Sequence, residues 1–195
     1  MAKSRKQSER SAPAAIYEMR IDLLNVKPSV WRRFIVPGSI SLSKLHTVLQ
    51  IVMGWEDYHL HLFTFGGRSY GVPDPDYPDE LQPLDQTEFT LDQALGSLRS
   101  FNYNYDFGDD WHHSITVEKV LAADTEVRWP RCIAGRNACP PEDVGGAYGY
   151  ADYLAAIADP SNENHKHMIE WRGEGFDPKA FDPIVVSQKL VAVEL

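Results

Sequence analysis

Histidines and acids on two predicted hairpins are the residues whose types and spacing can support chemistry. His59 and His61 stand two apart in the segment 59–65, whose pattern predicts a β-strand, so we expect both imidazoles on one face. Asp109 and His113 lie on the next predicted hairpin along the chain. If the two hairpins are neighbours in one sheet, His59, His61, His113 and Asp109 can form a mixed nitrogen and oxygen site for zinc, manganese or iron.

The same residues support two other interpretations. Histidines beside aromatic residues on strands usually hydrogen-bond to backbone or carboxylate groups, which is a structural role. Alternatively, His113 is an acid–base catalyst and Asp109 orients its ring. His112 has the opposite strand parity to His113, so only one of the two can reach a face shared with other histidines.

Two further groups of residues carry weaker indications. Arg32 and Arg33 follow Trp31 on a predicted strand and point to opposite faces, so one of them pairs with acidic residues or binds a ligand carboxylate or phosphate. Cys132 and Cys139 are separated by six residues, whereas paired zinc ligands are usually separated by about two to four. We expect free thiols with a structural role in a loop, and a metal or redox role stays an alternative.

Known phosphate-binding and nucleophile motifs are absent from the sequence. Asp106-Phe107-Gly108 spells the magnesium-binding tripeptide of protein kinases, but no glycine-rich ATP loop or catalytic-loop motif precedes it. We therefore interpret it as a strand end followed by a turn. The glycine-rich segment 145–149 precedes a helix and can receive an anion, but Glu142 and Asp143 just before it would repel one.

The elements that must position these residues do not follow the alternating βαβ order of a parallel sheet. Strands are predicted at 17–23, 30–36, 59–65, 68–71, 101–107 and 111–121, and helices at 41–54, 90–98, 150–158 and 161–171, with a Pro/Gly loop at 130–149. This order predicts an α+β fold, a largely antiparallel sheet with helices packed on one side. Residues 190–195 alternate like an edge strand, which would allow a homodimer formed by strand pairing.

Length and charge set the domain organisation and the expected partners. The 195 residues suit a basic, disordered tail over 1–15 and a single domain over 16–195. The net charge is −9, and residues 51–127 hold three basic and fifteen acidic side chains, which disfavours nucleic-acid binding by the folded body. No apolar stretch approaches the roughly 20 residues of a membrane helix, and no secretory core follows the start, so we expect a cytoplasmic protein.

A series of short motifs, in order, spans residues 16–190. They are Val30-Trp31-Arg32-Arg33, Val36-Pro37, Leu45-His46, Met53-Gly54-Trp55, His59-Leu60-His61, Tyr103-Asn104-Tyr105-Asp106-Phe107-Gly108-Asp109 with Trp111 and His113, Cys139-Pro140-Pro141-Glu142-Asp143, Gly145-Gly146, Gly149-Tyr150, Trp171 and Phe176-Asp177-Pro178. In these motifs the chain resembles the plasmid pRiA4b ORF-3-like family. The resemblance implies an α+β fold and a function largely unknown, although some members are labelled transposon passenger or resolvase-like proteins.

Three hypotheses of function follow. The first is a ligand-binding or accessory module with a polar groove, lined by His59, His61, Asp109, Trp111, His113 and Arg33. The second is a metal-dependent, hydrolase-like enzyme, in which the histidines bind a divalent ion and Asp109 or Glu142 activates water. The third is a DNA-transaction protein of a mobile element that binds DNA through its basic tail. The scattered arginines and acidic body give a recombinase little physical support.

Overall fold

One eight-stranded sheet organises the protein. The computed structural model describes residues 15–76, 82–121 and 130–193. The strand order is β5-β4-β3-β6-β7-β1-β2-β8, and all neighbours are antiparallel except β4 and β5. The strands are β1 Ile16–Leu23, β2 Trp31–Pro37, β3 His61–Phe65, β4 Arg68–Gly71, β5 Leu84–Asp85, β6 Ser100–Tyr105, β7 Trp111–Leu121 and β8 Arg131–Arg136. The helices are α1 Leu42–Met53, α2 Leu91–Leu95, α3 Gly146–Ala158, α4 His165–Arg172 and α5 Pro183–Leu190.

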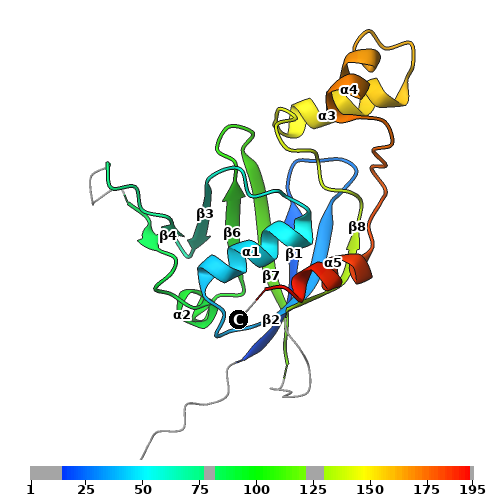
Figure 1. Cartoon of the computed structure of the whole chain (residues 1–195). Coiled ribbons are helices and arrows are strands. Elements are labelled where there is room, and N and C mark those ends of the chain that lie inside the picture. The colour runs from blue at the N-terminus through cyan, green and yellow to red at the C-terminus, as the bar shows by residue number, and fades with distance from the viewer. Residues whose placement is uncertain (1–14, 77–81, 122–129, 194–195) are drawn as a thin grey trace, which may run out of the picture.

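Helices α1 and α5 cover one face of the sheet, so the predicted α+β class is confirmed (Figure 1). Residues Met19 and Ile21 of β1 are fully buried beneath them, and the alternate residues Arg20 and Asp22 lie on the other face. Helices α3 and α4 differ from the prediction, because they stand beyond one end of the sheet (Figure 1).

The predicted helix over 41–54 is confirmed at both ends. The Ser41 hydroxyl accepts a hydrogen bond from the amide of Lys44, and Gly54 ends α1 with a left-handed φ of 106°. The helix predicted from residue 90 also starts as expected, since Thr90 and Gln93 form a capping box at the start of α2. These signals are local, so the sequence alone was enough to place them.

A buried arginine fastens the end of α1 to the sheet. The Arg32 guanidinium is 2% exposed and donates to the carbonyl oxygens of Val52 and Met53 at 2.8 and 3.2 Å. It also donates to the carbonyls of Trp31 and Arg136, both at 2.9 Å, so the same side chain joins α1, β2 and β8. Because the loop that follows α1 begins here, Arg32 fixes its starting point.

Two expectations for the second half of the chain are wrong. The segment 130–149 is not loop throughout, since it contains β8 and the start of α3. Gly135 lies within β8. A Cβ added there would stand 2.4 Å from the Phe181 ring and 2.8 Å from Arg32, so the glycine is needed for close packing and not for a turn. The expected edge strand at 190–195 is also wrong in its described part, since Leu190 is the buried last residue of α5.

The outer edge of β8 is partly occupied by α5. The Ser187 hydroxyl accepts a hydrogen bond from the Cys132 amide and donates one to the Cys132 carbonyl, at 3.1 and 2.7 Å. A side chain on the ladder groups of an edge strand opposes pairing with another strand. Residues 1–14 of the predicted tail and residues 194–195 lie outside the described residues. No helix in the described ranges is both long enough and apolar enough to span a bilayer.

Replacing Arg32 is expected to destabilise the fold far more than replacing its neighbour. Arg32→Leu leaves buried carbonyls without donors and should lower the free energy of unfolding by about 3 kcal/mol. Arg33→Leu breaks ion pairs with Glu118 and Glu18 at the surface and should cost about 1 kcal/mol or less. Urea denaturation of both variants checks this, and equal losses would contradict the role given to Arg32.

Candidate functional site

Three loops meet at one end of the sheet. They are the α1–β3 loop (54–60), the β6–β7 turn (106–110) and the β8–α3 loop (137–145). The amide of Gly145 donates to the Asp109 carboxylate at 3.0 Å, which ties the turn to the β8–α3 loop. Loops far apart in sequence are thereby held against one another on a rigid sheet, an arrangement common in binding and catalytic sites.

The tie between these loops depends on a glycine. A Cβ added to Gly146 would stand 2.6 Å from the Asp109 carbonyl oxygen, closer than real Cβ contacts allow. Its φ of 68° is also in the left-handed region that favours glycine. The glycine-rich segment thus serves close backbone approach.

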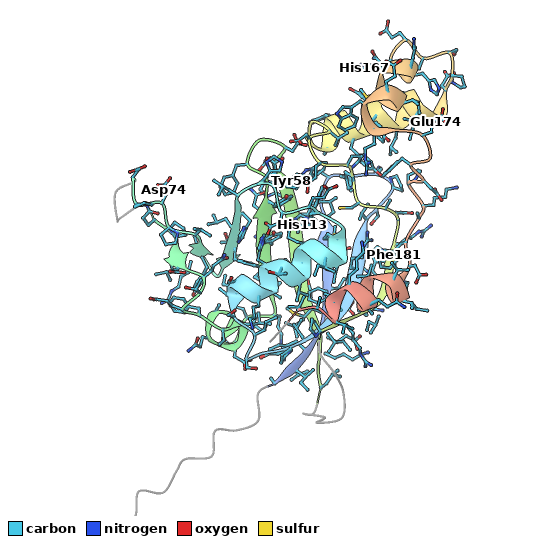
Figure 2. The ribbon with its side chains drawn as sticks, viewed as in Figure 1. Tyr58, Asp74, His113, His167, Glu174 and Phe181 are labelled. Atoms are coloured by element: carbon cyan, nitrogen blue, oxygen red, sulfur yellow. The ribbon has the colours of Figure 1, made fainter. Side chains whose placement is uncertain are left out.

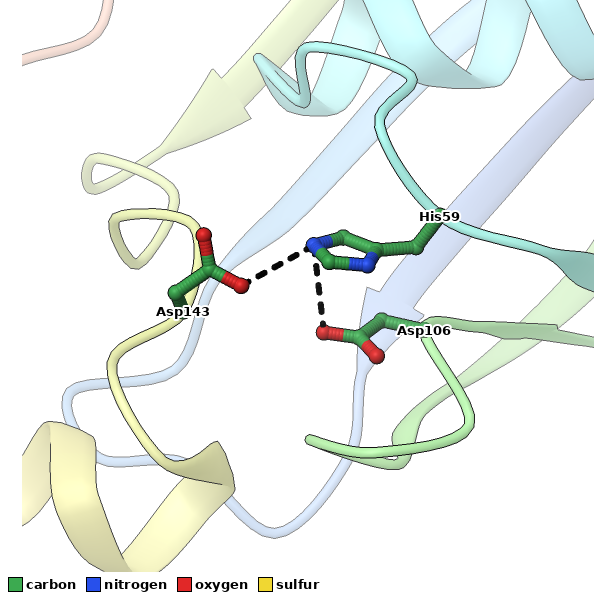
Figure 3. A group of neighbouring side chains, drawn as sticks. All are labelled: His59, Asp106 and Asp143. Carbon is green, nitrogen blue, oxygen red and sulfur yellow. Dashed lines mark ion pairs between the residues drawn. The ribbon is translucent and has the colours of Figure 1, made fainter.

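An imidazole and three carboxylates converge where the loops meet. Figure 3 shows the His59 Nε2 atom facing Asp106 Oδ2 and Asp143 Oδ1, at 3.6 and 3.1 Å. The Glu142 Oε2 atom lies 4.0 Å from the same nitrogen. We call these four residues the acidic histidine site. Within the described ranges, His59, Asp106 and Asp143 make up the group of potential metal ligands found with all ligand atoms within 4.8 Å of one another.

Two buried polar atoms of this site have no hydrogen-bond partner among the described residues. They are His59 Nε2, whose short contact with Asp143 is not aligned as a hydrogen bond, and Glu142 Oε2. The Glu142 side chain is only 8% exposed, and its other oxygen accepts hydrogen bonds from the Glu56 amide at 2.7 Å and the Tyr105 hydroxyl at 3.0 Å. The carboxylate is therefore held in place with one oxygen left available.

The electrostatics of the site favour a positive charge. Burial raises the pKa of the Glu142 carboxyl above its ordinary value, and the neighbouring Asp143 acts in the same direction. Asp106 and Asp143 both have left-handed backbone conformations, with φ of 56° and 57°, which an aspartate tolerates better than most residues. Special backbone conformations hold these two carboxylates in place, although like charges repel.

The distances from His59 Nε2 to three carboxylate oxygens suit ligands of one cation. Two ligands that each lie about 2.1 Å from an ion stand roughly 3 to 4.2 Å apart. The three contacts of His59 Nε2 fall between 3.1 and 4.0 Å. One imidazole with carboxylates is a donor set that suits manganese, iron or zinc.

The predicted metal set His59, His61, His113 and Asp109 is not assembled. The two hairpins are indeed adjacent, since His61 pairs with Tyr105 across β3 and β6. However, β3 begins at His61, so His59 lies in the preceding loop, where strand parity does not set the direction of its imidazole. His61 and His113 face the helix-covered side of the sheet, where each has other partners (His113 is labelled in Figure 2).

His61 belongs to a buried imidazole stack. Its ring lies parallel to that of His46 on α1, with 3.5 Å between centroids, and its Nε2 contacts Gln86 Oε1 at 2.8 Å. His46 contacts the Tyr103 hydroxyl and the Asp57 carboxylate, both at 2.8 Å. Burial, with the neighbouring His46, lowers the pKa of His61 to about 4, so the stack is neutral near pH 7.

His113 fills a structural role that its neighbours define. Its Nε2 accepts a hydrogen bond from the indole N–H of Trp55 at 3.3 Å, and its Nδ1 contacts the Tyr103 carbonyl at 3.2 Å. Nδ1 therefore carries the proton, and burial lowers the pKa of this ring to about 4. These contacts match the structural interpretation of the histidine and not the metal or acid–base one.

The other predicted groove residues are spread over the molecule. Trp111 is 1% exposed and packs near Trp55, Asp109 ties two loops together, and Arg33 pairs with Glu118 on the opposite face. Both cysteines are free, and burial raises the pKa of Cys132 to about 11.

Two members of the acidic histidine site, Asp106 and Asp143, are not predicted as ligands from the sequence, where Asp106 is interpreted as a strand end and Asp143 as a charge that repels an anion. Glu142 is predicted only as a base that activates water or as a second repelling charge. The usable indication was that these acids lie in motifs of the same series as His59, in segments rich in turn residues.

Comparison with known proteins places the chain in a family. The profile of the plasmid pRiA4b ORF-3-like proteins matches residues 15–184. The chain belongs to this family. This confirms the resemblance seen in the motifs.

Two similar proteins support that assignment. The chain is 40% identical over 162 residues to uncharacterized protein y4hQ of Sinorhizobium fredii, which covers 82% of each protein. It is also similar to the crystal structure of MM3350 from Methanosarcina mazei Go1, titled a protein of unknown function, with a TM-score of 0.80 and 32% identity. That match covers 89% of this chain and 97% of the other.

Acid is expected to destabilise the protein through its buried imidazoles. Because the folded-state pKa of His61 lies below the ordinary value of 6.5, its stabilising contribution is present above pH 6.5 and is lost as the pH falls towards 4. Between pH 6.5 and pH 4, the melting temperature of His61→Phe should therefore fall less than that of wild type. His112→Phe, at an exposed ring, should follow the wild-type slope, and equal slopes for all three proteins would contradict the account.

Proposed function

We propose that this protein is a divalent-cation-binding module and that the cation is held by His59, Asp106, Glu142 and Asp143. The observation that carries the proposal is the buried Glu142 oxygen without a hydrogen-bond partner, which lies 4.0 Å from a His59 nitrogen that also lacks one. Burying a carboxylate is costly unless it is paired or coordinates a metal. A cation would pair both atoms and offset the charge of the three acids.

This proposal revises the ligand groove expected from the sequence. The bound species is a cation at the meeting point of the three loops, and His59 is the one predicted groove residue that contacts it. Manganese, ferrous iron and zinc suit the donor set better than calcium or magnesium, because an imidazole nitrogen is a poorer ligand for the harder ions.

Titration with a metal alone tests the proposed function. Protein stripped with a chelator should bind a single Mn²⁺ or Zn²⁺ per chain by calorimetry and melt at a higher temperature with the ion. His59→Gln and Glu142→Gln should each weaken binding by about tenfold or more, since each removes a ligand. Asp110→Asn, at an exposed acid of the same turn that contacts Asn104 and His112, is the matched control and should keep wild-type affinity.

The stability of the metal-free variants separates loss of a ligand from loss of the fold. Glu142→Gln and Asp143→Asn each remove one of the crowded charges, so the metal-free variants should melt no lower than wild type while binding the ion less tightly. Wild-type protein that binds neither ion, or His59→Gln protein that binds as well as wild type, would overturn the proposal.

A second candidate function is a metal-dependent, hydrolase-like activity. The Asp143 side chain is 66% exposed, so a cation beside it could be reached by water and by a substrate. Protein supplied with Mn²⁺ should then hydrolyse p-nitrophenyl phosphate or p-nitrophenyl acetate faster than His59→Gln protein does. Equal rates for the two proteins on both compounds would exclude these substrate classes.

A further inference from the structure

A second polar cleft lies away from the acidic histidine site, at the ends of β2 and β8. Its volume is about 680 Å³, within the range of small-molecule sites. We call it the cationic cleft. It is lined by Arg20, Pro28, Ser29, Trp31, Arg136, Asn137, Pro178 and Lys179.

The charge of this cleft is opposite to that of the protein. The chain has 28 acidic and 19 basic residues, yet the lining includes three basic side chains and no acidic one. Arg20 is already bonded to the Asp22 carboxylate at 2.6 Å. Within the described part of the chain, the Arg136 and Lys179 side chains make no ion pair, so the charge of these two is uncompensated.

Neutral donors complement these two cations. Neither the Trp31 indole N–H nor the Ser29 hydroxyl has a hydrogen-bond partner among the described residues. Trp31 and Arg136 are directly paired across β2 and β8, so their side chains share a side of the sheet. A lining with several available donors and no carboxylate is suited to an acceptor-rich, negatively charged group.

The cleft is also held in shape before any ligand binds. The side-chain amide of Asn137 donates to the Ser29 carbonyl at 2.7 Å, and the backbone amide of Ala138 donates to the Pro178 carbonyl at 3.0 Å. Arg20 stacks on Trp31 with 4.3 Å between its guanidinium carbon and the ring centroid. The four segments of the lining are therefore fixed relative to one another, which lowers the entropy lost on binding.

We propose that the cationic cleft binds a small molecule bearing a phosphate or carboxylate group. Arg136 and Lys179 neutralise the anionic group, Trp31 and Ser29 donate hydrogen bonds, and Pro28 and Pro178 contact the remainder of the molecule. The proposal does not rest on the cation site, since the two sites share no residue. The arginine that binds the anionic group is thus Arg136, and not Arg32 or Arg33 as expected from the sequence.

Calorimetry with inorganic pyrophosphate and with citrate, in low salt and without divalent metal, tests the proposal and distinguishes the two anion classes. Wild-type protein should bind at least one of them. The double variant Arg136→Gln, Lys179→Gln should bind that anion about tenfold more weakly or worse, since loss of the two charged contacts together removes about 1.4 kcal/mol or more.

The matched control is Lys166→Gln, Arg172→Gln, which removes the same charge from exposed positions on α4. It should keep wild-type affinity. Circular dichroism of every variant checks the fold. The proposal is overturned if neither anion binds, or if the control loses as much affinity as the test variant. It is also overturned if a single-stranded oligonucleotide, titrated in the same buffer, binds and neither small anion does.

Discussion

The burial of the Glu142 carboxylate is the constraint on which the loop end of this protein depends. One oxygen accepts hydrogen bonds from the Glu56 amide and the Tyr105 hydroxyl, and so ties the β8–α3 loop to the α1–β3 loop and to β6. The other oxygen is buried beside His59 without a partner. A positive charge at that point would stabilise a geometry that is otherwise unfavourable for three neighbouring carboxylates.

The buried histidines make this geometry rigid. His46 binds Asp57 and His113 binds Trp55, so two positions in the first half of the α1–β3 loop are fixed to the helix-covered side of the sheet. His59 follows both positions in the loop and faces the acids. Two imidazoles with hydrogen bonds at both ring nitrogens thus support a third, His59, whose Nε2 has no hydrogen bond, which is how a rigid scaffold positions a site.

How much could be predicted from the sequence depended on the range of each interaction. Helix α1 was predicted because Ser41 and Gly54 each act on the helix turn next to them. The strands of the two hairpins followed from the alternation of residues, whereas the adjacency of the hairpins was an assumption that the structure bears out. Strand β8 was missed because its Gly135 resembles a turn residue. The absence of a side chain there makes room for the Phe181 ring, which lies far along the chain. The metal set failed for a similar reason, since β3 begins two residues later than expected and the acids that face His59 come from two other loops.

The most direct measurement of the central claim is the anomalous scattering of a crystal grown with Mn²⁺. The account predicts a single strong peak among His59, Asp106, Glu142 and Asp143, about 2.1–2.2 Å from the His59 Nε2 atom and from a Glu142 oxygen. A map with no peak there, in which the His59 ring turns to hydrogen-bond a carboxylate, would contradict it.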